Sequence, residues 1–192
     1  MVSALSLFTT FTDPHHLEEQ IESALTYIRL APLFETKLVK LKPGPPRSIM
    51  ATEKHWQYLA RALNRMIPIA RQHGVRLAFE THLNELTDTS ISSQRLTEMA
   101  PSDVVRLTVD FLNSAFAGEK MNEVIHVLKD RMYHTHIKNG YIDAKGGWHF
   151  QTLDEGLINY PMVLNLLKKA GYTKYLSIEC LSSQANERPV ET

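Results

Sequence analysis

Four segments of the sequence carry, at or near their carboxyl ends, side chains that could bind a divalent cation. These strand-like runs are residues 75–82, 105–110, 132–138 and 175–179. Because successive side chains of a strand point to opposite faces, one face takes the apolar Phe79, Val109, Ile137 and Ile178. The other face takes Glu80, Asp110, His136 and Glu179. Crowded carboxylates repel one another unless a cation or a proton pairs with them, so we predict that these four residues bind one metal ion.

The donor atoms of this set narrow the choice of metal. Three carboxylates and one imidazole suit a hard or borderline cation such as Mn²⁺, Mg²⁺ or Co²⁺, with Zn²⁺ as a further candidate. Other polar side chains share the same face at neighbouring positions. His82 follows Glu80 by two residues, and His134 and Lys138 flank His136 at the same spacing. We interpret His134 as a buried, hydrogen-bonded histidine one layer deeper than the ligands.

The elements that carry these residues alternate between strands and helices. Further strands are predicted at 2–10 and 37–42. Helices are predicted from residue 13 onward, at 53–73, 92–99 and 120–129, and between 160 and 171. This βαβα alternation is typical of a parallel sheet with helices outside, and in α/β barrels the active site lies at the carboxyl ends of the strands. A closed eight-stranded barrel usually needs about 200 residues or more. We therefore predict one α/β domain, residues 1–192, built as a barrel truncated to about six parallel strands.

Composition excludes several classes of protein. The 192 residues contain 21 basic and 21 acidic side chains, so no basic surface for nucleic acid is expected. The sequence contains no run of about 18 apolar residues, so no membrane span is expected. The amino terminus lacks the basic region of a signal peptide. The single cysteine, Cys180, rules out an intrachain disulfide. We expect a cytoplasmic protein with a small-molecule ligand.

Several motifs, in this order and spacing, resemble one known family. They are Ala78-Phe-Glu-Thr-His82, Val109-Asp-Phe-Leu-Asn113, His134-Thr-His-Ile-Lys138, Asp154-Glu-Gly-Leu-Ile-Asn159 and Leu176-Ser-Ile-Glu179. Together they resemble the xylose isomerase-like TIM barrels of the sugar phosphate isomerase/epimerase superfamily. The match begins at the family's third βα unit, so the first two units are absent. Asn139 stands where the family usually has Asp.

This resemblance implies a metal-dependent sugar isomerase or epimerase that acts on a small sugar or sugar phosphate. The metal would polarise a carbonyl, and Glu80 and Glu179 would remove and return a proton on the adjacent carbon. The resemblance also implies substrate-binding roles, for His82, Lys138, Asn113 and Lys40. Three of these residues also have a simpler interpretation. Lys138 could be a solvent-exposed lysine at a strand end, Asn113 could cap a loop, and His82 could orient the metal ligands without touching the substrate.

Two other functions remain open at this point. The missing βα units favour a non-catalytic or inactive barrel fragment that binds metal or sugar. An apurinic endonuclease-like hydrolase shares the barrel, but Asn113 stands where that nuclease has a histidine. An open barrel would also expose strand edges at 2–10 and 175–179, and such edges recruit partners. Because the tail 181–192 is too polar to cover them, we expect a homodimer or a place in a longer chain.

Overall fold

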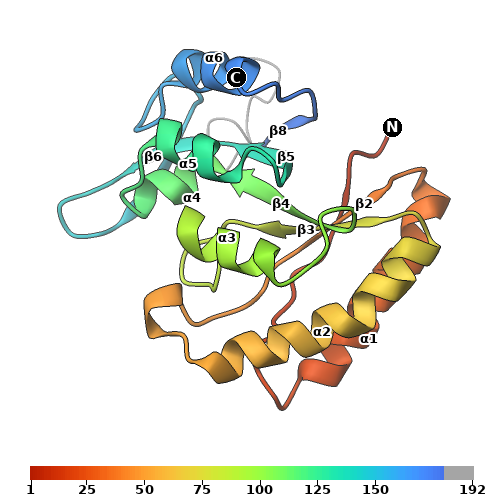
Figure 1. The fold of residues 1–192 in the computed structure, drawn as a ribbon. Helices are drawn as coiled ribbons and strands as arrows, with labels where there is room; N and C mark the ends of the chain where they lie inside the picture. Colours follow the sequence, from red (N-terminus) through yellow and green to blue (C-terminus); the bar gives the residue numbers. More distant parts are fainter. Residues whose placement is uncertain (180–192) are drawn as a thin grey trace.

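Six parallel strands form one curled sheet in the computed structural model, which describes residues 1–179 (Figure 1). Their order across the sheet is β1-β2-β3-β4-β5-β8. The strands are β1 (Leu5–Ser6), β2 (Leu38–Leu41), β3 (Arg76–Glu80), β4 (Val105–Asp110), β5 (Met132–Ile137) and β8 (Leu176–Ile178). Because every connection between neighbours crosses over through a helix, all six carboxyl ends lie on the same edge. The predicted fold class, a truncated α/β barrel, is confirmed.

The helices cover the outer face of this sheet (Figure 1). They are α1 (Leu17–Leu30), α2 (Glu53–Gln72), α3 (Ser90–Glu98), α4 (Phe111–Phe116), α5 (Met121–Leu128) and α6 (Tyr160–Lys169), with short 3₁₀ turns at Ala31–Phe34 and Ser48–Met50. The apolar stripe of α2, which includes Leu59 and Leu63, is buried against the sheet together with Leu77 and Phe79 of β3. Helix packing thus takes one face of each strand and leaves the opposite face for the polar residues.

Sequence patterns placed some element ends wrongly. The strand predicted at 2–10 is only Leu5–Ser6, because these two residues alone pair with β2 before the chain turns away. The first helix was expected from residue 13 but starts at Leu17, since the Asp13 carboxylate instead accepts a hydrogen bond from the His15 backbone in a preceding turn. By contrast, α2 begins at Glu53 as predicted, and Gly74 follows it with φ 64°.

Two elements were not expected. Helix α4 starts directly after β4, with the Asp110 carboxylate as its cap. The stretch 139–156, predicted only as a loop, contains an antiparallel hairpin of β6 (Asn139–Ile142) and β7 (Trp148–Gln151). The Asn139 side chain, fully buried, donates to the carbonyls of Leu153 and Ile158 and accepts from the Ile158 backbone. An amide can make this donor and acceptor pattern and a carboxylate cannot.

The two ends of the sheet have apolar side chains in solvent. Within residues 1–179, β1 pairs only with β2, and β8 pairs only with β5. Large hydrophobic side chains beside these strands are exposed, among them Phe8 (74%), Tyr175 (48%) and Ile178 (59%). In the described part of the chain, the two edges expected from the sequence are without a further strand partner. The tail at 181–192, which we judged too polar to cover them, and Cys180 lie outside the described residues. No helix in the described part of the chain is long and apolar enough to cross a membrane.

Candidate metal centre

The four residues predicted as metal ligands converge at the carboxyl edge of the sheet. Glu80 ends β3, Asp110 ends β4, His136 lies near the end of β5, and Glu179 follows β8. One ligand atom from each lies within 4.8 Å of every other. The register explains this convergence, because Asp110 is paired with His136 across the β4–β5 ladder, and Glu80 lies one strand away opposite Thr108. The structure brings together a set that spans 100 residues of sequence.

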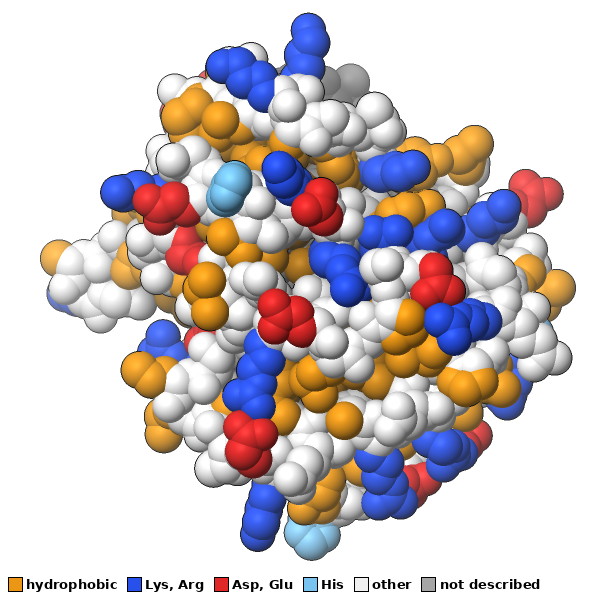
Figure 2. All heavy atoms as spheres, viewed as in Figure 1, with side chains coloured by type: hydrophobic (Ala, Val, Ile, Leu, Met, Phe, Trp, Pro, Cys, Tyr) orange, Lys and Arg blue, Asp and Glu red, His pale blue; other side chains and the backbone are white. Residues whose placement is uncertain are grey.

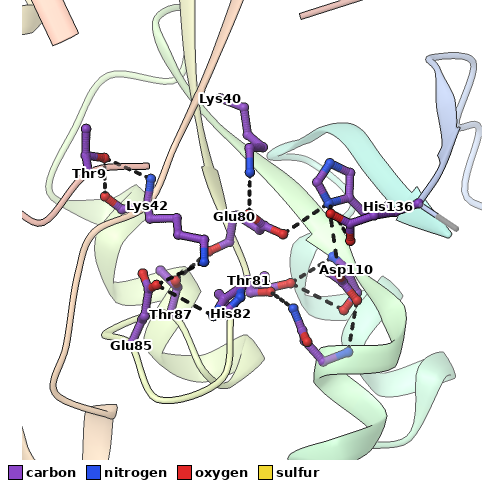
Figure 3. Close-up of polar contacts among 12 residues, drawn as sticks. Thr9, Lys40, Lys42, Glu80, Thr81, His82, Glu85, Thr87, Asp110 and His136 are labelled. Carbon is purple, nitrogen blue, oxygen red and sulfur yellow. Dashed lines mark hydrogen bonds and ion pairs between the residues drawn. The ribbon is translucent and has the colours of Figure 1, made fainter. Parts of the chain in front are cut away.

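Glu80 is held between two donors on neighbouring strands. Its Oε2 accepts from Lys40 Nζ of β2 at 2.6 Å, and its Oε1 lies 3.0 Å from Nδ1 of His136 (Figure 3). The side chain is only 2% exposed. Burial pushes the pKa of Glu80 upward, but the hydrogen bond from His136 and the charge of Lys40 outweigh burial and leave the pKa well below its ordinary value. Glu80 is therefore a carboxylate at neutral pH.

Asp110 has a different electrostatic environment. Its Oδ1 accepts from the Asn113 backbone at 2.9 Å, and its Oδ2 contacts the Lys138 ammonium at 2.7 Å. Burial raises the pKa of Asp110 to about 6, against the opposing charge of Lys138. The Lys138 ammonium also contacts Glu179 Oε2 at 2.7 Å. Burial lowers the pKa of Lys138, but its two carboxylate partners reverse this and raise the pKa.

The donor atoms fit a divalent cation. Nδ1 of His136 lies 3.0 Å from Glu80 Oε1, 3.6 Å from Glu179 Oε2 and 3.9 Å from Asp110 Oδ2, so all four donors face one small volume. Within residues 1–179, Oδ2 of Asp110 touches Lys138 but has no hydrogen bond of good geometry. A buried carboxylate oxygen in this state can accept a metal ion. The Lys138 ammonium occupies the position of a competing cation.

Neighbouring groups fix the ends of the ligand strands. The Asp110 backbone donates to Thr81 Oγ1, and the Asn113 amide donates to the Thr81 carbonyl. The Asn113 side chain therefore ties β3 to α4 in this structure. Tyr160 Oη accepts from the Lys138 backbone N–H and donates to its carbonyl, at 2.9 and 2.6 Å. These contacts orient Asp110 and Lys138.

A second polar group lies beside the centre, toward β2. Lys42 Nζ is 3.4 Å from Glu85 Oε1, and Nδ1 of His82 is 3.6 Å from the same oxygen (Figure 3). The Gly44 backbone donates to Glu85 as well. Burial raises the pKa of Glu85, with Lys42 opposing it. Sequence reasoning missed Glu85, because it lies in a loop after β3 where strand parity has no meaning.

The remaining predicted residues fall into clear places. Lys40 and Lys138 both reach into the centre, and both are nearly fully buried, which excludes the solvent-exposed interpretation of Lys138. His82 lies at the rim, with 28% of its side chain exposed and Nδ1 against the Leu83 carbonyl. His134 is buried below the centre with Nε2 2.8 Å from Ser177 Oγ. The metal-binding and substrate-binding roles of all these residues stay predictions.

Comparisons with known proteins place this geometry in context. The model of the family described as "Xylose isomerase-like TIM barrel" matches residues 2–192. An inosose dehydratase of Clostridium tetani is 24% identical over 171 residues, covering 82% of this chain and 55% of its own length. The chain thus spans about half the length of the curated relatives it matches.

Solved structures agree on the fold. The probable 3-DHS dehydratase AsbF from Bacillus anthracis has a TM-score of 0.84 at 21% identity, over 97% of this chain and 72% of that one. An L-ribulose 3-epimerase has a TM-score of 0.77 at 20% identity, over 97% and 65%. The IOLI protein, solved with a zinc atom, has a TM-score of 0.80 at 17% identity, over 96% and 70%.

Proposed function

The chain belongs to the xylose isomerase-like TIM barrel family. We propose that it forms the catalytic site of a metal-dependent enzyme that acts on a small polyhydroxylated aldehyde or ketone. The reaction would begin with removal of a proton from the carbon next to the carbonyl. The observation that carries this proposal is the convergence of Glu80, Asp110, His136 and Glu179 within 4.8 Å. The names of the relatives, which are sugar epimerases and dehydratases, support the same substrate class.

The chain's own residues can supply the proton transfers. When bound, a divalent cation would polarise the substrate carbonyl and stabilise the negative charge that develops on its oxygen. Glu80 is ionised and held rigidly by Lys40 and His136, so it is a proton acceptor of fixed position. Glu179 is a third exposed and lies at the open side of the centre. One carboxylate can therefore accept the proton on one side of a substrate carbon, and the other, in its protonated carboxylic acid form, can return a proton from the other side.

The basic side chains around the centre can position substrate hydroxyls. Lys138 lies between Asp110 and Glu179, and an ammonium displaced from these carboxylates by a cation would be free to bind a substrate oxygen. His82 is at the rim, partly exposed, and next to Lys42. Burial lowers the pKa of His82, with the charge of Lys42 acting in the same direction, so its imidazole is neutral at physiological pH and can both donate and accept.

Two outcomes can follow from the same first step. Returning the proton to the same or the neighbouring carbon gives epimerisation or isomerisation, the reaction expected from the motifs. Losing a hydroxyl from the next carbon gives dehydration, and this second candidate is favoured by the dehydratase names among the matches. The two differ in whether a hydroxyl leaves after the proton is removed.

The test is a combined metal and isotope experiment. Metal content of the purified protein is measured first, and the protein is then incubated with Mn²⁺, Mg²⁺, Co²⁺ or Zn²⁺ and a panel of ketoses, aldoses and keto-cyclitols in D₂O. We expect cation-dependent exchange of one carbon-bound hydrogen for deuterium, visible by NMR as loss of a C–H signal. Formation of an enone indicates dehydration, and an epimer or isomer indicates the other outcome. Metal binding without exchange in any substrate would refute the enzyme proposal and favour a non-catalytic binding protein.

A further inference from the structure

Three ion pairs join the segment at the carboxyl end of β2 to the segment at the carboxyl end of β3. In chain order, and with N···O distances of 2.6, 3.4 and 3.5 Å, they are Lys40–Glu80, Lys42–Glu85 and Arg47–Asp88. Among residues 1–179, the three positive charges of this series are therefore matched one to one by negative charges. The first pair belongs to the metal centre, and the second lies directly beside it (Figure 3).

The pair of Lys42 and Glu85 is shielded from water, because each side chain is only 12% exposed. The Gly44 backbone donates to Oε2 of Glu85 at 3.1 Å, and the Lys42 ammonium lies 3.4 Å from Oε1. N–H donors on both oxygens favour the ionised form of the carboxyl group. In such a site the attraction between two opposite charges is screened far less than it is on the surface.

Backbone hydrogen bonds fix both members of this pair. The Leu86 N–H donates to the Gly44 carbonyl at 3.0 Å, so the loop that carries Glu85 is bonded to the loop after β2. The Thr9 hydroxyl accepts from the Lys42 backbone N–H and donates to the Lys42 carbonyl. The two charges are thus held together by the fold itself, whether or not a ligand is bound.

The ring of His82 adds a hydrogen-bond acceptor at the same place. Its Nδ1 lies 2.9 Å from the Leu83 carbonyl and 3.6 Å from Oε1 of Glu85. Carbonyl and carboxylate oxygens only accept, so Nδ1 carries the proton of the neutral ring and Nε2 carries the lone pair. Lys42, His82 and Glu85, the rim subsite, therefore combine ammonium donors and an imidazole acceptor with no net charge.

A hydroxyl group matches the rim subsite better than an oxyanion does. A hydroxyl can accept from the Lys42 ammonium and donate to the acceptor of His82 at the same time. A phosphate dianion or a carboxylate has no hydrogen to donate to His82. Its negative charge also gains little from an ammonium that Glu85 already neutralises.

We propose, as an inference that rests on the proposed function, that Glu85 is a specificity-determining residue. By pairing with Lys42, it makes the rim subsite select a hydroxyl group of the substrate over a phosphate or a carboxylate. The substrate is then a polyhydroxylated carbonyl compound without an anionic group at this end. Glu85 acts through Lys42 and His82, and it takes no part in the proton transfers.

The first experiment removes the charge of Glu85 and measures anion binding by the metal-free full chain. Isothermal calorimetry at pH 8 uses inorganic phosphate and malonate, each compared with sodium chloride at the same ionic strength. Glu85→Gln keeps an acceptor for the Gly44 backbone and leaves the Lys42 charge unpaired. We expect this variant to bind at least one of the two anions about tenfold or more tightly than the wild type, through new charge-assisted hydrogen bonds. Adding Lys42→Met to Glu85→Gln should return the affinity to the wild-type value.

The matched control is Glu123→Gln on α5, which also frees a lysine. Lys120 lies 3.6 Å from Glu123, and both side chains are largely exposed. Figure 2 shows acidic and basic side chains next to one another in solvent on the helix-covered face, where water and salt screen such charges. We expect anion affinity within about twofold of the wild type, and circular dichroism checks the fold of every variant.

The second experiment tests the consequence for the substrate by hydrogen exchange in D₂O. The wild type should show a higher kcat/KM for neutral ketoses or aldoses than for the same sugars with a phosphate at the end away from the carbonyl. Glu85→Gln should shift this ratio toward the phosphorylated sugars by about tenfold or more, and an unchanged ratio would contradict the role of Glu85. Absence of exchange with every sugar would instead refute the proposed function, and calorimetry alone would then decide the role of Glu85.

Two calorimetric results would overturn the proposal. One is equal anion affinity of the wild type and Glu85→Gln. The other is phosphate binding by the wild type that Lys42→Met abolishes, since Lys42 would then bind an oxyanion despite its carboxylate partner. This second result does not depend on the folding of Glu85→Gln.

Discussion

Replacement of Lys138 by methionine should destabilise the metal-free protein in a strongly pH-dependent way. The change keeps the aliphatic stem and removes an ammonium that lies 2.7 Å from both Asp110 and Glu179. Glu179 is a third exposed, so water replaces much of what it loses. Asp110 is fully buried and would keep an unpaired charge, which costs about 3–5 kcal/mol if the carboxylate stays ionised.

Protonation of Asp110 limits this cost, because the neutral carboxyl group needs no cation. Burial raises the pKa of Asp110 to about 6. Protonating it at pH 8, two pH units above this pKa, costs about 2.7 kcal/mol at 1.36 kcal/mol per unit. We therefore expect Lys138→Met to lose about 2.7 kcal/mol of unfolding free energy at pH 8 and close to nothing at pH 6. The sign follows from linkage: the variant's native state binds a proton that the unfolded state releases, so its deficit grows as pH rises.

The assay is urea denaturation in the presence of EDTA at pH 6, 7 and 8. Lys168→Met, on the last turn of α6 and without an ion pair in the described chain, is the matched control. Titration with Mn²⁺ should restore the variant, since a cation replaces the missing charge, and its affinity should exceed that of the wild type because no ammonium competes. A deficit of equal size at pH 6 and pH 8 would refute the reasoning, because it would report lost packing rather than an unpaired carboxylate.

Three further expectations follow from the same structure. Glu179→Gln should lower turnover by about 10²–10⁴ with the fold retained, while Glu123→Gln on α5 should not; a loss within about tenfold would remove Glu179 from proton transfer. The pKa of His134 is lowered from 6.5 to about 4, by burial and then by the charges of His136 and Lys40. Between pH 4 and 6.5 this histidine is protonated in the unfolded protein and neutral in the folded one. The unfolding free energy of the wild type should therefore rise by roughly 3 kcal/mol over this range, relative to that of His134→Gln. The same pH dependence of stability in both proteins, measured by urea denaturation, would contradict this. Light scattering at micromolar concentration should detect a dimer or larger species, because β1 and β8 are edge strands without a further partner in residues 1–179; a monomer would contradict that expectation.

The sequence predicted which four side chains converge better than it predicted where the elements begin and end. Parity along a strand is enforced by the pleat, so placing Phe79 in the core fixes Glu80 on the opposite face. The same logic applies to Asp110 and His136. Strand ends depend instead on which residues find a partner on the next strand, and β1 is limited to Leu5–Ser6 for that reason. A single sequence carries little information about such pairing.

What the sequence could not predict is the pairing of charges. Lys138 was assigned to the same face as the ligands and Lys40 to substrate binding, but their contacts with particular carboxylates depend on distances between strands that are far apart in sequence. Glu85 and the hairpin after β5 were missed because loops lack a periodic signal. Tyr133 faces Arg76 and Arg106 although parity would point it away from them, since the β4–β5 register shifts between Leu107 and Thr108.

The position of Glu179 links the metal centre to the open side of the sheet. Among residues 1–179, β8 is an edge strand of three residues that pairs only with β5, and its large side chains are exposed. Glu179 follows it directly and contacts Lys138 and His136, so the polar centre already ties this edge to β5. A cation held jointly by Glu179 and the carboxylates of β3 and β4 would tie β8 across the sheet. Metal affinity and the order of the β8 edge should therefore be coupled, because each requires Glu179 to stay at the same place.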